Sequence, residues 1–481
     1  MNHQTYSEHL NWVAGGDSHA VVIGGSLAGL LSARVLSDHF SRVTVIERDV
    51  YPETPEARRG VPQARHLHAL LQRGKQILER LFPGITDELA ADGAPVLDVA
   101  NDIAWLTPGG WGVRFHSSMS GISFSRSLFD WHVRRRVRQI PNVAFLEGCD
   151  AEGLVAEGGV VTGVSLRFGD GTKAESYLSA DLVVDASGRR SRAPKWLESL
   201  GFEAPAETVI NARLGYASRL YRGVGRFDTN AAGAFIQAAP PRHTRGGIIF
   251  PIENGLWILT VVGGGGDFPT ADETEFLEFV RSLRSPIIYD AIKDAAPATP
   301  IQTYRATENR RRHYEQLKRM PDCFIVIGDA ACAFNPVYGQ GMSTAAIGVE
   351  ALDRCLRQHR GGNLKGMAAQ FQRRLARANA APWTMATGED YRYKGTEGGR
   401  PDRKTRFMHG YMDYVMQLSS KDVRVRRVLL EAFNLLIAPT ALFRPSILFK
   451  VAVQALRSKR GTGENTQTTF ERSRRKAASE I

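Results

Sequence analysis

The chain has 481 residues, a formal net charge of +12 and a hydrophobic fraction of 43%; these values exclude an intrinsically disordered chain and indicate a folded protein long enough for two domains. The first eighteen residues hold no apolar run, and no stretch reaches about 18 apolar residues without a charge or a proline, so we expect neither a signal peptide nor a membrane-spanning helix. The four cysteines form no pair with metal-ligand or redox spacing, which indicates reduced thiols, a cytoplasmic protein and no metal site.

The N-terminal part of the chain has the pattern of a dinucleotide-binding unit. An apolar strand at 20–23 is followed at once by a glycine-rich turn, an apolar helix and a second strand that ends in Glu47. Gly24 permits the tight turn, Gly29 lets helix and strand approach, and the free N–H groups at the helix start suit a pyrophosphate. Ser26 stands where the usual fingerprint has its middle glycine, and Glu47 suits the hydroxyls of a ribose. The predicted cofactor-binding residues of this unit are Gly24, Ser26, Ala28, Gly29, Glu47 and Arg48.

A second strand-and-loop pattern lies at residues 181–192. An apolar strand ends at Asp185 and enters a loop of small residues, hydroxyls and three arginines. Such a loop suits phosphates or the edge of a nicotinamide cofactor, and arginines that are merely solvated are an equally good account. We take Gly188 as a cofactor-binding residue. After this loop, strand-like runs within 206–265 and an amphipathic helix at 272–284 indicate a mixed sheet that forms one wall of a substrate pocket.

The third pattern contains a carboxylate and a second helix start. An apolar strand at 323–327 runs into a Gly-Asp pair, and after a proline the sequence GQGM at 339–342 opens a helix that reaches about residue 357. The carboxylate of Asp329 suits the hydroxyls of a polyol such as ribityl. The N-terminus of the helix would stabilise negative charge on a reduced flavin ring. The predicted cofactor-binding residues here are Gly328, Asp329, Pro336, Gly339, Gly341 and Met342.

In this order, the three motifs resemble those of the FAD-dependent monooxygenases with the para-hydroxybenzoate hydroxylase fold, over roughly residues 18–390. The resemblance implies an α/β protein in which a Rossmann-like FAD-binding domain is interleaved with a mixed β-sheet substrate domain. It implies bound FAD, reduced by NADPH or NADH, and a contact between Arg126 and FAD. The middle motif departs from the family because the usual Asp-Gly pair is Ser187-Gly188 here, which leaves its role toward NAD(P)H open.

A narrower resemblance is to the bacterial polyether epoxidases, which are similar to squalene epoxidase. It rests on the runs RGVPQARHLHALL at 59–71, NRRR at 309–312 and NPVYGQGM at 335–342. Those enzymes form a C4a-hydroperoxyflavin from O2 and epoxidise alkenes, so the resemblance implies epoxidation or hydroxylation of a small apolar, isoprenoid-like or polyene-like substrate. His66 and His68 are predicted to be ordinary histidines at the start of a helix, and the alternative is that Arg65 or His68 borders the flavin edge. The lack of a third ligand beside the two histidines argues against a metal.

The last sixth of the chain carries most of the excess charge. From residue 401 to the end there are 16 Lys and Arg against 7 Asp and Glu. Apolar runs at 428–438 and 447–456 are too interrupted to span a bilayer, so they suit helices that cover the pocket or a peripheral membrane contact through the basic C-terminal region. No nucleic-acid motif accompanies the charge, so we expect no nucleic-acid partner. A further basic run, Arg134–Arg136, is predicted to be a solvated helix face.

The predicted organisation has five parts and leaves two other activities open. The parts are an FAD-binding domain at 18–205 with substrate-domain segments near 85–125, a substrate-binding sheet at 206–305, a closing FAD-binding part at 306–393, an α-helical region at 394–456 and a basic disordered tail at 457–481. A flavin-dependent reductase or dehydrogenase of an isoprenoid would share the cofactor. A flavin-dependent halogenase would share the fold, but Trp257 lacks the Trp-x-Trp-x-Ile-Pro context expected of one.

Overall fold

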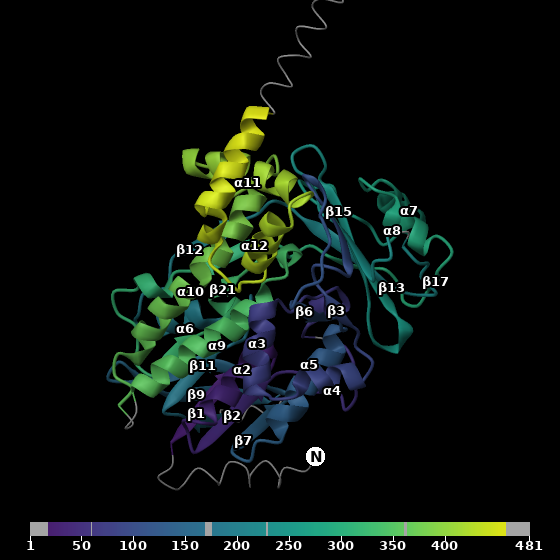
Figure 1. Cartoon of the computed structure of the whole chain (residues 1–481). Helices are drawn as coiled ribbons and strands as arrows, with labels where there is room; N and C mark the ends of the chain where they lie inside the picture. Colours follow the sequence, from purple (N-terminus) through teal and green to yellow (C-terminus); the bar gives the residue numbers. More distant parts are fainter. Residues whose placement is uncertain (1–17, 59, 169–175, 228, 360–362, 458–481) are drawn as a thin grey trace, which may run out of the picture.

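The structure, a computed structural model, describes residues 18–58, 60–168, 176–227, 229–359 and 363–457. It confirms the predicted α/β class: a parallel sheet lies in the lower part of Figure 1, a mixed sheet at the upper right and the C-terminal helices at the top. The predicted disordered tail lies outside the described residues from 458 onward. No helix in the described ranges is long and apolar enough to cross a membrane.

Five parallel strands form the first sheet, in the order β20-β11-β1-β2-β7. Its strands are short apolar runs because both faces are covered, by α2 on one side and by the three-stranded sheet β10-β9-β8 on the other. The bounds are β1 (His19–Ile23), β2 (Arg42–Glu47), β7 (Val143–Glu147), β8 (Cys149–Glu157), β9 (Val160–Phe168), β10 (Ser176–Ser179), β11 (Leu182–Asp185) and β20 (Phe324–Val326). Parallel strands place their carboxyl ends at one edge, so the three sequence motifs meet there.

The helices around this sheet come from distant parts of the chain. α2 packs beside α9, and α9 also packs against α3 and α10. α2 is apolar except for Ser32 and Arg34, because most of it is buried between the sheet and these helices. The bounds are α2 (Leu27–Leu36), α3 (Gln72–Leu81), α4 (Ile85–Ala91), α5 (Arg126–Arg138), α6 (Ala193–Ser199), α9 (Gly341–Gln358) and α10 (Met367–Asp390).

The second sheet mixes strands from two separate stretches of sequence. Its order is β17-β13-β16-β15-β14-β4-β5, β18 pairs with β13, and β4 lies parallel to β14. The helices α7 (Glu273–Arg281) and α8 (Ile287–Ile292) cover its outer face (Figure 1) and share its apolar core. The strand bounds are β4 (Ile103–Thr107), β5 (Gly110–Trp111), β13 (Gly215–Arg222), β14 (Gly233–Ile236), β15 (Arg245–Pro251), β16 (Trp257–Gly263), β17 (Ala296–Pro297) and β18 (Gln302–Tyr304).

The remaining elements are small strands, which form two further sheets, and short 3-10 turns. The strands form a pair, β3-β6, and a three-stranded sheet, β12-β19-β21. The bounds are β3 (Val96–Asp98), β6 (Ser120–Ile122), β12 (Glu207–Ile210), β19 (Asn309–Arg312), β21 (Cys332–Ala333), η2 (Pro62–Arg65), η3 (Glu253–Gly255), η4 (Tyr314–Gln316), η5 (Gly328–Ala330), η6 (Pro336–Tyr338) and η7 (Pro439–Phe443).

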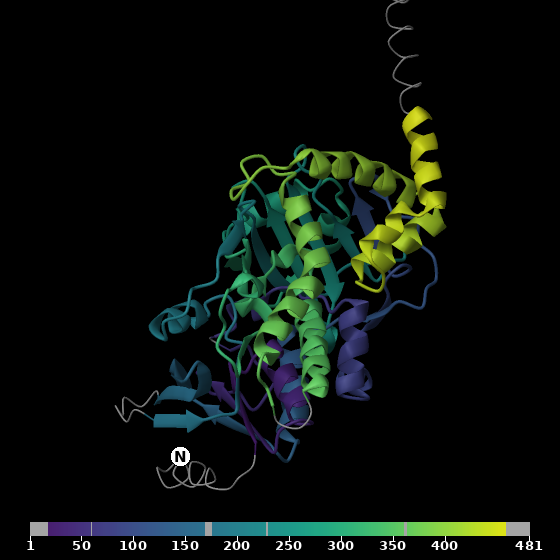
Figure 2. The same ribbon diagram turned by 90° about the vertical axis from the view of Figure 1, so that its left-hand side faces the viewer.

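The C-terminal helices form a unit with its own apolar core. α11 (Arg403–Ser419) and α12 (Val423–Phe433) pack together and against a last helix at 445–457 (Figure 2). Asp402 and Asp422 begin the two labelled helices, because each carboxylate accepts backbone N–H groups of the first turn. The predicted α-helical C-terminal region is therefore present, and it lies against the mixed sheet rather than apart from it.

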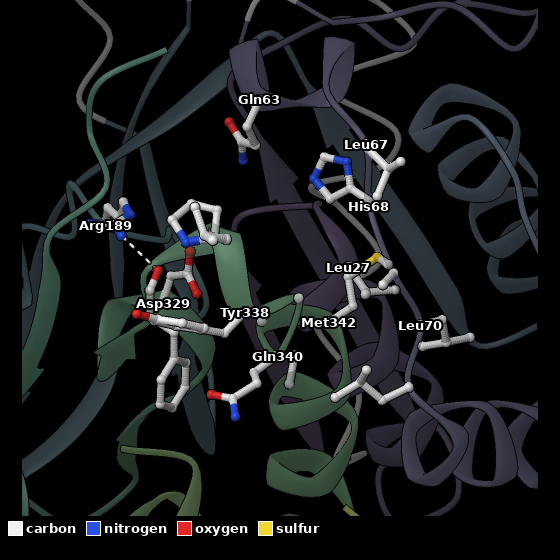
Figure 3. Close-up of a pocket in the computed structure, with 18 of the residues that line it drawn as sticks. Leu27, Gln63, Leu67, His68, Leu70, Arg189, Asp329, Tyr338, Gln340 and Met342 are labelled. Atoms are coloured by element: carbon white, nitrogen blue, oxygen red, sulfur yellow. Dashed lines mark hydrogen bonds between the residues drawn. The ribbon is translucent and has the colours of Figure 1, made fainter. Parts of the chain in front are cut away.

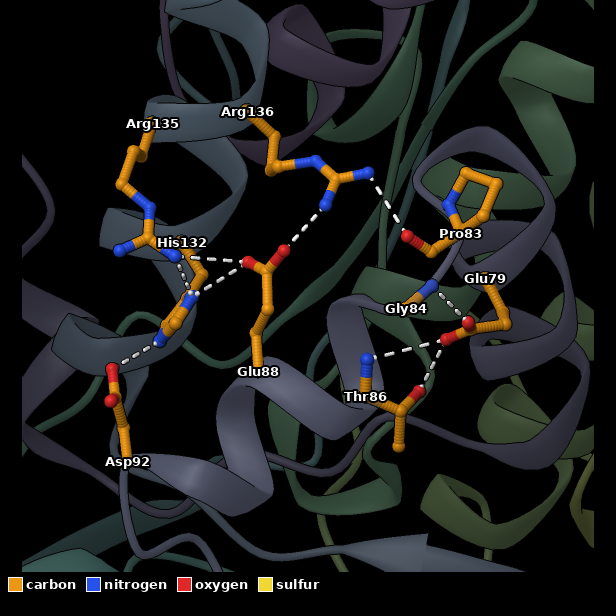
Figure 4. A network of polar contacts seen from close by, with 9 residues as sticks. All are labelled: Glu79, Pro83, Gly84, Thr86, Glu88, Asp92, His132, Arg135 and Arg136. Atoms are coloured by element: carbon orange, nitrogen blue, oxygen red, sulfur yellow. Dashed lines mark hydrogen bonds and ion pairs between the residues drawn. The ribbon is translucent and has the colours of Figure 1, made fainter.

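The basic run on α5 is not a solvated face. Arg134 is buried, donates to the carbonyl of Pro52 and stacks on the ring of Tyr51. Arg135 and Arg136 both bind the carboxylate of Glu88 on α4, as Figure 4 shows. The sequence-based prediction is wrong here because it ignored α4, which supplies the counter-charge that fixes the two helices together.

Candidate functional site

A cavity of about 1620 Å³ lies at the carboxyl ends of the parallel strands and extends between the mixed sheet and the C-terminal helices. Pockets for a single small ligand measure roughly 300–1,000 Å³, so this one has room for a dinucleotide and a second molecule. Most predicted cofactor-binding residues line it, from all three motifs. They are Gly24, Ser26, Ala28, Glu47, Arg48, Arg126, Gly188, Asp329, Pro336, Gly339, Gly341 and Met342.

Two predicted glycines lie behind the cavity wall. A Cβ at Gly29 would stand 1.8 Å from the carbonyl oxygen of Gly24, and one at Gly328 would stand 2.7 Å from the Cβ of Ala28. Both positions therefore require a residue without a side chain. At the start of α2, the first-turn N–H groups have no helical acceptor, and Ser26 makes no side-chain cap. These donors suit the pyrophosphate of a dinucleotide.

Glu47 lines the cavity but is already engaged by the protein. Its Oε2 accepts the N–H of Gly25 at 2.9 Å and pairs with Arg58 at 3.1 Å, and its Oε1 accepts the N–H of Asp49 at 3.0 Å. A carboxylate has about four lone-pair positions, so capacity for a ribose hydroxyl remains. Sequence reasoning missed Arg58, which no motif distinguishes from the neighbouring arginines.

Asp329 is a half-buried carboxylate at the cavity wall that accepts no hydrogen bond from the described residues. Burial raises its pKa, while the nearby charges of Arg189 and Arg126 lower it. A carboxylate in this position is free to accept hydrogen bonds from a ligand in the cavity. The hydroxyls of a ribityl chain are such donors, so Asp329 fits FAD. Figure 3 shows Asp329, Arg189 and Met342 among the residues around the same space.

The middle loop is tied to residues 334–342, which we call the flavin-ring loop after their predicted role. Asp185 is fully buried and accepts from the backbone N–H of Ser187 and from Ser191, which fixes the turn at Gly188. Arg189 donates to the carbonyl oxygens of Glu308 and Phe334 at 2.8 and 2.9 Å. Arg189 therefore links the two loops and is not merely solvated. Because it also lines the cavity, its contact with a phosphate or a nicotinamide stays a prediction.

The two predicted flavin-edge residues lie in different places. His68 lines the cavity, and Figure 3 shows its ring pointing into it. Its Nδ1 lies 2.9 Å from the carbonyl oxygen of His66, which only accepts, so Nδ1 carries the proton. Burial lowers the pKa of His68 to about 3, so the ring is neutral and Nε2 is left as an acceptor. Arg65 is outside the lining and donates to Gln302.

The far half of the cavity, which we call the apolar lobe, is formed by side chains of the mixed sheet and the C-terminal helices. The ring of Trp105 lies 5.2 Å from that of Phe235 and 5.8 Å from that of Phe433. Further apolar lining comes from Met408, Met412, Leu442 and Phe443. Sequence reasoning placed apolar helices over the pocket but did not name these residues. Within the described ranges, no cluster of His, Cys, Asp and Glu is suited to a metal ion.

A family model described as FAD binding domain matches residues 17–365, which is most of the chain. The chain belongs to this FAD-binding family. Protein Rv3254 of Mycobacterium tuberculosis (strain ATCC 25618 / H37Rv) is 34% identical to this flavoprotein over 375 residues, 76% of this chain and 79% of its own. Squalene epoxidase 3 of Arabidopsis thaliana is 24% identical over 345 residues, 69% and 58% of the two chains. Kynurenine 3-monooxygenase of Salinispora arenicola is 26% identical over 350 residues, 70% and 72% of the two.

Solved structures show the same fold. The flavin-dependent brominase Bmp2 matches with a TM-score of 0.66 at 17% identity, over 92% of this chain and all of its own. PqsL of Pseudomonas aeruginosa, a probable FAD-dependent monooxygenase, matches with a TM-score of 0.58 at 16% identity, over 78% and 96% of the two chains. The flavoprotein is thus an FAD-dependent oxidoreductase of the monooxygenase family, with NAD(P)H as the reductant. The squalene epoxidases are distant relatives.

Proposed function

We propose that this flavoprotein inserts one oxygen atom of O2 into a small apolar substrate that bears an alkene, such as an isoprenoid or a polyene. The product is an epoxide or an alcohol. The observation that carries the proposal is the continuity of the cavity, in which the cofactor motifs and the apolar lobe line a single space. An apolar wall in the same cavity as the cofactor motifs favours an apolar substrate over a polar one.

The residues of this chain would bind the cofactor, orient the substrate and exclude water from both. FAD, once reduced by NAD(P)H, supplies the oxygen-activating chemistry. Asp329 would hold the polyol, and the N-terminus of α9 would stabilise negative charge at the ring. Trp105, Phe235 and Phe433 would position the substrate and keep water from it. The overall balance is substrate, O2, NAD(P)H and one proton going to oxygenated substrate, NAD(P)+ and water.

Incubation of the FAD-loaded protein with NADPH, oxygen-18 gas and a panel of linear isoprenoids, polyenes and aromatic controls tests the proposal. The expected result is a product heavier by one oxygen-18 atom, seen by mass spectrometry, with NADPH consumed in step. A reduced or desaturated product without oxygen-18 would indicate the reductase or dehydrogenase alternative. A product that gains bromine or chlorine from added halide would indicate a halogenase, in line with the brominase fold.

We also propose a peripheral contact between the C-terminal helices and an anionic membrane surface. α11 contributes Met408 to the cavity and exposes 69% of Phe407. Phe449 and Leu456 on the last helix are 71% and 64% exposed. Basic residues lie on the same helices, and each one near an anionic surface contributes about 1 kcal/mol. An apolar substrate would then reach the cavity from the lipid.

Sedimentation with vesicles of anionic phospholipid tests this contact. Wild-type protein should pellet at low salt and be released as salt rises. The double variant Phe407→Ser, Phe449→Ser should stay in the supernatant, whereas Tyr177→Ser, which changes an exposed aromatic residue on β10, should pellet like the wild type. Wild-type protein that never pellets would refute the membrane contact and leave the proposed oxygenation untouched.

A further inference from the structure

Behind the flavin-ring loop, a buried carboxylate is held by three hydrogen-bond donors. Asp390, the last residue of α10, is 0% exposed. Its Oδ1 accepts from the hydroxyl of Tyr338 at 2.7 Å and from Nδ2 of Asn335 at 3.0 Å, and its Oδ2 accepts from Nδ2 of Asn309 at 2.6 Å. No ion pair to Asp390 occurs within the described residues. Nothing in the cofactor motifs explains this arrangement.

The orientation of both amide side chains is fixed. The backbone N–H of Asn335 donates to Oδ1 of Asn309 at 2.7 Å, and the backbone N–H of Val337 donates to Oδ1 of Asn335 at 3.2 Å. A backbone N–H can only donate, so both Oδ1 atoms are acceptors and both Nδ2 groups must face Asp390. An amide nitrogen also only donates. Neither of these two hydrogen bonds can therefore reverse its direction.

Tyr338 differs from the two amides in two respects. A hydroxyl can both donate and accept, so the hydrogen bond between Tyr338 and Asp390 can reverse. Of the four residues in this cluster, Tyr338 alone is among the described residues that line the cavity. If Asp390 is protonated, its O–H must donate a hydrogen bond to the hydroxyl oxygen of Tyr338, and the phenol O–H must then donate to another acceptor.

We infer that Asp390 and Tyr338 form a proton switch at the flavin-ring loop, in which Asp390 exchanges one proton with the cavity through the hydroxyl of Tyr338. In the delivering direction, the O–H bond of the Asp390 carboxyl breaks as a new O–H bond forms on Tyr338. The original phenol O–H bond breaks as its proton passes to water or to a bound ligand in the cavity. The products are an ionised Asp390 and a neutral Tyr338, and uptake is the reverse.

The surroundings of Asp390 allow both protonation states near neutral pH. Burial raises the pKa of Asp390 to about 7; the three donors oppose this, and the charge of Glu389 on the same helix adds to it. The other titratable groups that act with it are Tyr338, Tyr391 and Tyr393, all with raised pKa. β19 contributes only the neutral amide of Asn309. The switch rests on the proposed function, because monooxygenation consumes one proton per turnover.

The test uses the full-length, FAD-loaded protein without substrate or reductant, over about pH 5 to 9. Infrared difference spectra report the protonated carboxyl of Asp390, and visible difference spectra report the flavin. Wild-type protein should show one proton transition in both signals. Asp390→Asn should lose both. Tyr338→Phe should keep the carboxyl band, with its midpoint moved to higher pH by the lost donor, and should lose the flavin signal.

Asp353→Asn on α9 is the matched control, because it removes a partly exposed carboxylate far from this cluster, and it should keep both signals. A transition that persists in Asp390→Asn, or a flavin signal in Tyr338→Phe equal to that of the wild type, would overturn the switch. If Asp390→Asn does not fold, Tyr338→Phe decides alone, since it keeps the ring. Because no oxygenation is measured, failure to form an oxygen-18 product leaves this result standing.

Discussion

The two halves of the cavity are built by different means. The nucleotide half consists of backbone turns at the carboxyl ends of neighbouring parallel strands, where glycines allow close approach and single carboxylates follow the turns. The apolar lobe consists of large side chains from β4, β14 and α12, which are far apart in the sequence. Recognition of the cofactor is therefore local in the sequence, whereas recognition of the substrate depends on tertiary packing.

The largest effect is expected from Gly29→Ala. The added Cβ would meet the carbonyl oxygen of Gly24 at 1.8 Å, and that backbone cannot move without opening the pyrophosphate turn. FAD binding measured by fluorescence should weaken by about 100-fold or more. Gly410→Ala, where the new Cβ has no neighbour within 4 Å, should bind FAD like the wild type. Equal FAD affinity in both variants would contradict a nucleotide half built on backbone turns.

Asp329→Ala should separate cofactor binding from stability. Loss of the hydrogen bond to a polyol should weaken FAD binding by roughly 0.5–3 kcal/mol. The melting temperature of the FAD-free protein should not fall, because the half-buried carboxylate accepts no hydrogen bond from the described residues. Calorimetry and thermal melting measure the two effects. A variant that binds FAD normally but melts early would show that Asp329 is structural.

Phe433→Ala should weaken the binding of an apolar ligand and leave the binding of FAD unchanged. Truncation removes part of the wall beside Trp105, and a bound apolar ligand should lose roughly 1–2 kcal/mol of burial, a factor of about 5 to 30 in affinity. FAD affinity should remain that of the wild type. Titration of the FAD-loaded protein with a fluorescent polyene measures the first quantity. Parallel loss of FAD would mean that the two halves are not independent.

The smallest effect is expected from Glu47→Ala. Its carboxylate already binds Gly25 and Arg58, so a ribose would use only part of it. FAD should loosen by up to about tenfold, or roughly 1.4 kcal/mol. The absorption spectrum of bound flavin should stay unchanged, because the ring lies at the other end of the cofactor. A changed spectrum would place the flavin ring near Glu47 and contradict the account.

The comparison also explains what could be predicted from the sequence. Gly24 directly follows β1, Glu47 is the last residue of β2, and Asp329 lies three residues after the end of β20. Parallel strands bring residues at their carboxyl ends together at one edge of the sheet. Arg189 links two motif loops through carbonyl groups, and no sequence pattern announces such a contact. Trp105 reaches the cavity because β4 crosses into the mixed sheet beside β14.

The wrong prediction for α5 and the failure to predict a role for Asp390 have the same cause. The basic run of α5 was predicted to be solvated because Glu88, its partner, belongs to another helix. Asp390 escaped notice because its three donors come from β19 and the flavin-ring loop. In both cases, a single charged residue depends on groups that only the folded chain brings near it.

A crystal structure of the FAD complex would test the central claim most directly, namely that one cavity holds FAD in one half and leaves the apolar lobe for the substrate. The account predicts pyrophosphate at the start of α2, polyol hydroxyls on Asp329, and the flavin ring at residues 339–342 with its open side toward Trp105. A flavin ring bound outside this cavity, or one that itself fills the space beside Trp105 and Phe433, would contradict it.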